Sequence, residues 1–266
     1  VGLPPGSPVY IGHRDPTQAV LSLLSFDEAE YGEVYPDTVE ALLAAIKPGK
    51  RNWINVNGLS GGLVEALCAG LGVHSLVVED ILNVEHRPRV EAYDDYLFLI
   101  TKMLSIHEDS SLEYEQVCFI VTDSLVVTFQ ETPGDCFGPI RQRLATGVGR
   151  IRRSGTDYLA YALLDVIVDN YFLVLEGQGD VLDHLEIRAT NPNPAASGEF
   201  VAELQQAKAG LLRLRRVLWP VRDSVSALGR LDGRFLGPEL QPFLRDLLEN
   251  MVQAVEAVET FREHAA

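Results

Sequence analysis

The sequence has little positive charge. Its 266 residues include 22 Lys and Arg against 38 Asp and Glu, which gives a formal net charge of −16. Proteins that bind nucleic acid neutralise phosphates with clustered Lys and Arg, so the balance argues against a nucleic-acid partner. An acidic surface suits cations and basic partners, although it also serves simply to keep a protein soluble.

Cysteine is scarce as well. The three cysteines, Cys68, Cys118 and Cys136, are odd in number and form no CxxC pair, which favours reduced, buried thiols. The six histidines are scattered, and HExxH, zinc-finger and nucleophile-elbow patterns are absent. The sequence therefore does not indicate an enzyme.

Long hydrophobic runs are also missing. No stretch of about 18 apolar residues occurs, so the chain as given is not expected to span a bilayer. The last helical pattern begins at Pro238 and reaches the final residues with no Gly, Asn or Pro to stop it. We therefore expect this helix to continue in a longer protein.

Residues 1–150 predict a mixed α/β domain, in which helices flank a mixed sheet. Strand patterns at 18–26 and 52–56 alternate with helical patterns at 38–46, 63–71 and 76–82, and Ser75 is the expected cap of the third helix. Strand patterns rich in Val, Ile, Phe and Tyr follow, and three of them lie close enough in sequence to form an antiparallel meander. They occupy residues 90–93, 96–104, 114–122 and 125–130.

The remainder predicts long helices with no strand between them. Patterns at 156–189 and 197–228 flank an Asn-Pro turn at 191–194, so residues 151–232 are expected to form an antiparallel hairpin. Pro220 is expected to kink or interrupt its second helix. Residues 233–266 would begin a long stalk helix.

Acids within these apolar helical patterns are the best candidates for a functional site. A buried carboxylate is costly unless it is paired or binds a cation, and Mg²⁺ takes one or two carboxylates while keeping several waters. Salt bridges to nearby arginines are the alternative, and the helix dipole can account for an acidic pair early in a helix. The candidate ligands are Glu79, Asp80, Asp165, Asp169, Asp246 and Glu249.

Several stretches resemble the cytoplasmic domain of the CorA family of magnesium and cobalt channels. The most specific is LVVEDILNVEHRPRVE at 76–91, and the resemblance extends from about residue 53 to 262. The other stretches lie at 130–135, 157–171, 218–222 and 245–262.

The resemblance implies a homopentamer in the inner membrane, with this region on the cytoplasmic side. The last helix would lead into the first of two spans outside this chain. It also implies regulatory Mg²⁺, with Co²⁺ or another divalent cation possible, between subunits. Asp80 would face Asp246 of a neighbour, Glu79 and Asp165 would form a second site, and Glu249 would assist. The family's Gly-Met-Asn pore motif is absent from this chain.

Two alternatives remain open. A zinc-transporting branch of the family shares the fold. A soluble helical interaction module, whose acids only keep it solvated, would have no metal function.

Overall fold

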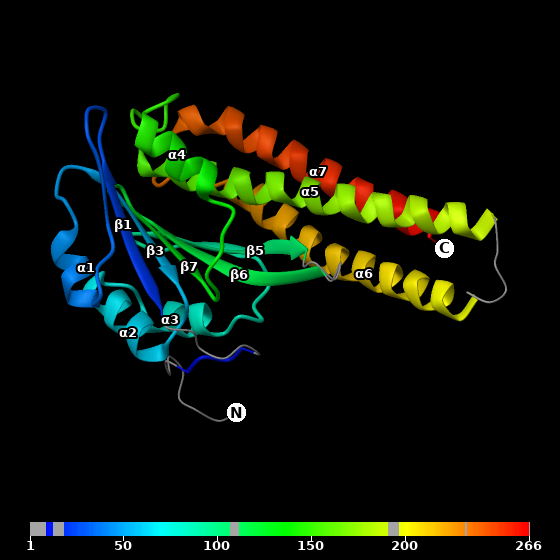
Figure 1. Ribbon diagram of the computed structural model, residues 1–266. Coiled ribbons are helices and arrows are strands. Elements are labelled where there is room, and N and C mark those ends of the chain that lie inside the picture. The colour runs from blue at the N-terminus through cyan, green and yellow to red at the C-terminus, as the bar shows by residue number, and fades with distance from the viewer. Residues whose placement is uncertain (1–8, 13–18, 107–111, 191–196, 232, 266) are drawn as a thin grey trace.

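The computed structural model describes residues 9–12, 19–106, 112–190, 197–231 and 233–265 (Figure 1). Their strands form one mixed sheet in the order β2-β1-β3-β7-β6-β5-β4, with β3 and β7 parallel and the other neighbours antiparallel. The predicted mixed sheet is thereby confirmed. The strands are β1 (Val20–Phe26), β2 (Tyr31–Val34), β3 (Arg51–Asn57), β4 (Arg89–Ala92), β5 (Leu97–Ile106), β6 (Leu112–Val121) and β7 (Leu125–Gln130).

Helices cover both faces of this sheet, because alternate side chains of each strand point to opposite sides. On one face, α1 (Val39–Ala45), α2 (Gly61–Gly70) and α3 (Ser75–Leu82) enclose a core that includes Ile54 and Val56. Trp53 points to the opposite core, which contains the buried faces of the later helices. These are α4 (Gly138–Thr146), α5 (Thr156–Thr190), α6 (Ser197–Leu228) and α7 (Gln241–His264), the last preceded by a 3-10 turn at Pro238–Leu240.

The three long helices extend beyond the end of the sheet, as Figure 1 shows. Helices α5 and α6 run antiparallel, as the sequence predicts, and α7 packs against both. Pro220 does not interrupt α6, which is continuous from Ser197 to Leu228, so that part of the expectation was wrong. Buried apolar side chains on both sides of Pro220, including Leu218 and Val221, hold the helix together through this position.

The start of α3 also differs from the expectation. His74, not Ser75, caps the helix: its Nδ1 accepts a hydrogen bond from the Leu76 N–H at 3.2 Å, and Ser75 is the first helical residue. The Tyr96 hydroxyl accepts from the His74 N–H at 3.1 Å, which fixes His74 in the capping position. The turn expected at 191–194 lies outside the described residues, as does most of the segment before residue 19.

Helix α5 is long and apolar enough, by length and composition alone, to cross a membrane. Its most apolar window has a mean hydropathy of 1.6, although Asp165 and Asp169 interrupt the apolar run of this helix. However, 56% of that window is buried inside the fold. The hydrophobicity of α5 is therefore explained by its position in the core, where it packs against both the sheet and α7.

Candidate metal sites

Asp80 lies near the end of α3, where the chain turns toward β4. Its Oδ2 accepts a hydrogen bond from Arg89 Nη2 at 2.6 Å, and its Oδ1 lies 3.0 Å from His86 Nε2. The side chain is 16% exposed, so most of it is shielded from solvent. Arg89, which follows α3, thus supplies the positive charge that offsets the cost of partly burying the Asp80 carboxylate.

His86 contributes less positive charge to this contact than Arg89 does. Burial lowers the pKa of His86, and this effect outweighs the opposing effect of the Asp80 charge. Arg89 also binds Glu91 Oε1 through its Nε at 2.8 Å, so it is shared between two carboxylates. Glu79 precedes Asp80 on the same helix and is half-buried.

The second group of acids lies on α5 and α7. Asp165 and Asp169 are one turn apart on α5, and Asp246 lies on α7, which packs along α5. Within the described residues none of these three carboxylates makes an ion pair with Lys, Arg or His. Glu249 is exposed one turn after Asp246.

The three carboxylates repel one another. Burial is the largest cause that raises the pKa of Asp165, to about 6, and the charges of Asp169 and Asp246 raise it further. A hydrogen bond from the Tyr161 hydroxyl opposes the shift. Burial also raises the pKa of Asp169, again with a contribution from Asp246. The Arg143 charge offsets this repulsion only in part, because the pKa of Asp165 stays raised, and a hard cation would relieve it further.

The two groups of acids lie on opposite faces of the sheet. Helix α3 belongs to the core on one face, whereas α5 and α7 belong to the core on the other (Figure 1). Across the described residues of one chain, no three His, Cys, Asp or Glu side chains are grouped so that they could hold a metal ion. Within one chain, the fold therefore does not bring Asp80 and Asp246 together.

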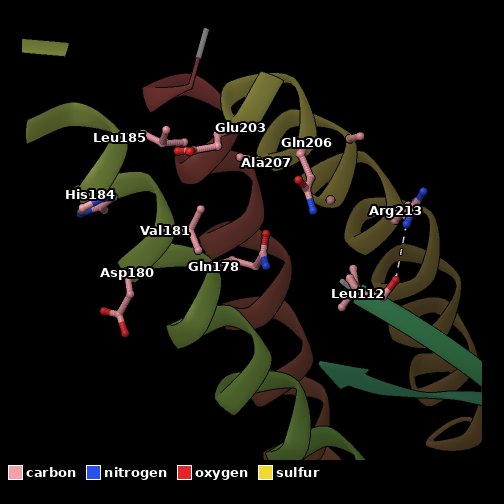
Figure 2. Close-up of a pocket in the computed structure, with 12 residues that line it drawn as sticks. Leu112, Gln178, Asp180, Val181, His184, Leu185, Glu203, Gln206, Ala207 and Arg213 are labelled. Atoms are coloured by element: carbon pink, nitrogen blue, oxygen red, sulfur yellow. Dashed lines mark hydrogen bonds between the residues drawn. The ribbon is translucent and has the colours of Figure 1, made fainter. Parts of the chain in front are cut away.

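A well-formed cavity lies elsewhere. It lies between α5 and α6, near the start of β6 (Figure 2), and its volume is about 590 Å³. Asp180, His184 and Glu203 line it, together with Gln178 and apolar side chains. Glu203 is bound by Arg188. None of the predicted metal ligands lines this cavity.

Sequence reasoning missed the partners that hold these acids. His86 and Arg89 stand in the quoted motif, yet nothing in their spacing shows that both contact Asp80. Tyr161 precedes Asp165 by four residues on α5, and this helical spacing is the one signal that could have predicted their hydrogen bond.

The fold matches those of two solved soluble domains. The structure matches the soluble domain of CorA from Methanocaldococcus jannaschii with a TM-score of 0.77, 18% identity and 95% coverage of each chain. It also matches the cytoplasmic domain of ZntB from Vibrio parahaemolyticus with a TM-score of 0.73, 15% identity and 94% coverage of each.

Sequence similarity identifies the family. Residues 49–266 match the family described as CorA-like Mg2+ transporter protein. The chain is 36% identical over 265 residues to the cobalt/magnesium transport protein CorA of Thermotoga maritima, covering 98% of this chain and 74% of that protein. The chain therefore belongs to the CorA family, whose members are transporters and not enzymes.

Proposed function

We propose that this chain is the metal-sensing and gating domain of a pentameric Mg²⁺/Co²⁺ channel of the inner membrane, and that it faces the cytoplasm. Asp80 of one subunit and Asp246 of the next would share one regulatory Mg²⁺. Glu79 and Asp165 would supply a second site, with Asp169 and Glu249 as further ligands. The carrying observation is the group of like-charged carboxylates on α5 and α7, which form no ion pair within the described residues and whose mutual repulsion the Arg143 charge offsets only in part.

The donor chemistry fits a hard cation. All six candidate ligands are carboxylates, and Mg²⁺ prefers oxygen ligands and retains water. Zinc favours thiolate and imidazole ligands, and the one imidazole at these sites, that of His86, already contacts Asp80. The donor set supports the magnesium alternative over the zinc alternative, although the ZntB domain shares the fold.

The gating step follows from electrostatics. With the ion bound, the carboxylates of adjoining subunits attract the same positive charge, and the closed ring is stabilised. When intracellular Mg²⁺ falls, the same carboxylates repel one another, and the subunit contacts weaken. The ion shifts the equilibrium only because it binds the closed arrangement more tightly than the open one.

Thermal melting of this chain together with sedimentation tests the proposal. We expect Mg²⁺ to raise the melting temperature and promote self-association, relative to EDTA at matched ionic strength. Asp246→Asn should abolish both effects, whereas Glu256→Gln, which removes an exposed acid from the same helix, should preserve them. Identical melting with and without Mg²⁺ or Co²⁺, at concentrations where the chain self-associates, would favour the interaction-module alternative. Stabilisation by Zn²⁺ alone would favour the zinc branch.

A further inference from the structure

A cavity lined mainly by positively charged side chains lies between α6 and the segment that connects α3 to β4. Its volume is about 240 Å³. Its cations are Arg87, Lys102, Arg213 and Arg216, against the single carboxylate of Glu85. This concentration is unusual in a chain with a net charge of −16, and it raises the question of what these cations bind.

These arginines have few hydrogen-bond or ion-pair partners among the described residues. Arg87 and Arg216 make no hydrogen bond or ion pair with any residue that the structure describes. Arg213 reaches only the Leu112 carbonyl, at 3.5 Å, as the dashed line in Figure 2 shows. Arg213 and Arg216 are three residues apart on α6, so they project from the same side of the helix. Their guanidinium groups are therefore available to an external acceptor.

Lys102 adds a buried charge to the cavity. It is 5% exposed, and its Nζ donates to the Val84 carbonyl at 2.6 Å and to Gln116 Oε1 at 3.3 Å. Both acceptors are neutral, so neither offsets the ammonium charge. The Tyr114 ring lies 5.6 Å from Nζ on another side. Burial lowers the pKa of Lys102, and the charges of Glu85 and Glu131 offset this shift only in part, so an anion in the cavity would stabilise the charged ammonium group.

We propose that this cavity binds a short phosphate-bearing anion. Guanidinium groups bind phosphate oxygens with paired, charge-assisted hydrogen bonds, and two of them on one helix face match a phosphate chain. A second cavity of about 290 Å³ shares Glu85, Tyr114 and Arg213 with the first and is also lined by Glu113 and Glu131. These acids repel an anion, so the ligand is expected to be short and to stay on the basic side.

Titration calorimetry of this chain with tripolyphosphate tests the site, in EDTA so that no divalent cation binds either partner. We expect one site per chain, with an affinity that falls as salt is added. The double variant Arg213→Gln/Arg216→Gln should weaken binding by at least about tenfold. Arg215→Gln is the matched control, because Arg215 lies between them in sequence but contacts Glu259, and it should change the affinity by less than about twofold.

Further arms identify the source of the phosphate. Binding of ATP with the affinity of tripolyphosphate indicates that the phosphate chain alone is recognised, and tighter binding of ATP indicates a nucleotide ligand. Arg87→Gln, on the exposed corner, gives an independent loss of affinity if the double variant fails to fold. Absence of binding, or an equal loss in Arg215→Gln, would overturn the proposal. So would a double variant that changes self-association and leaves tripolyphosphate binding intact, because the cavity would then serve a second copy of the chain.

Discussion

Arg89 Nη2 lies 2.6 Å from Asp80 Oδ2, so the acid at the centre of the most specific motif already has a positive partner within its own chain. A cation that binds Asp80 must compete with this guanidinium. Under the proposed function, the pair would raise the Mg²⁺ concentration at which a site containing Asp80 fills. Arg89 also binds Glu91, so it has a second carboxylate to which it can remain attached.

Arg89→Gln should strengthen divalent-cation binding. The change removes a positive charge next to Asp80 and frees one carboxylate oxygen, while His86 continues to orient the other. We expect an affinity gain of about tenfold for Co²⁺ or Mg²⁺ by calorimetry. Arg222→Gln, which breaks the exposed pair with Asp223, is the control and should leave the affinity unchanged. A weaker affinity in Arg89→Gln would show instead that Arg89 holds Asp80 in its binding position.

The raised pKa of Asp165 predicts that the metal-free chain becomes more stable as the pH falls from 7 to 5. Its pKa rises from 3.8 to about 6 on folding, so folding favours the protonated form. The stabilisation is complete below about pH 4 and is lost as the pH rises through 6. The gain between pH 7 and 5 should be roughly 1 kcal/mol after solvent screening.

Urea unfolding in EDTA across this pH range measures the effect. Asp165→Asn should flatten the pH dependence and raise the stability at pH 7, because the amide carries no charge for Asp169 and Asp246 to repel. Glu256→Gln, on the exposed side of α7, should preserve the slope. A slope that is the same in Asp165→Asn and the wild type would assign the dependence to other groups.

Trp53→Ala should be severely destabilising. The indole is fully buried, its Nε1 donates to Thr128 Oγ1 at 3.0 Å, and its ring packs edge-on against Phe137 at 5.8 Å. A cavity of this size costs about 3–5 kcal/mol in the free energy of unfolding. Trp219→Ala is the comparison, because that ring is only half-buried, and its cost in urea unfolding should be clearly smaller.

The three thiols should be unreactive in the native protein. Burial raises the pKa of Cys68, Cys118 and Cys136 to about 12, so little thiolate exists at pH 8. We expect slow modification by a disulfide reagent, beginning at Cys136, which is the most exposed of the three. Denaturant should release all three at once. Rapid modification of Cys68 without denaturant would contradict its burial.

The predicted elements of the chain match the structure closely where the sequence period is strong. The apolar run of β7 and the long pattern of α5 were both located from sequence, because burial on two faces leaves a dense hydrophobic signal. Helix ends were less predictable. The cap of α3 is His74 because Tyr96, from a distant part of the chain, fixes its backbone, and no local pattern contains that information. The division of the chain at residues 150 and 232 stays a prediction.

By itself, the sequence determined the mixed sheet, the helical hairpin, the family and the identity of the candidate acids. Each depends on local periodicity or on residues that lie together in a motif. Only the tertiary structure decided that Asp80 is held by His86 and Arg89, that Asp246 approaches Asp165 and Asp169, and that the two groups lie on opposite faces of one sheet. These relationships depend on strand order and helix packing, which join residues far apart in the chain.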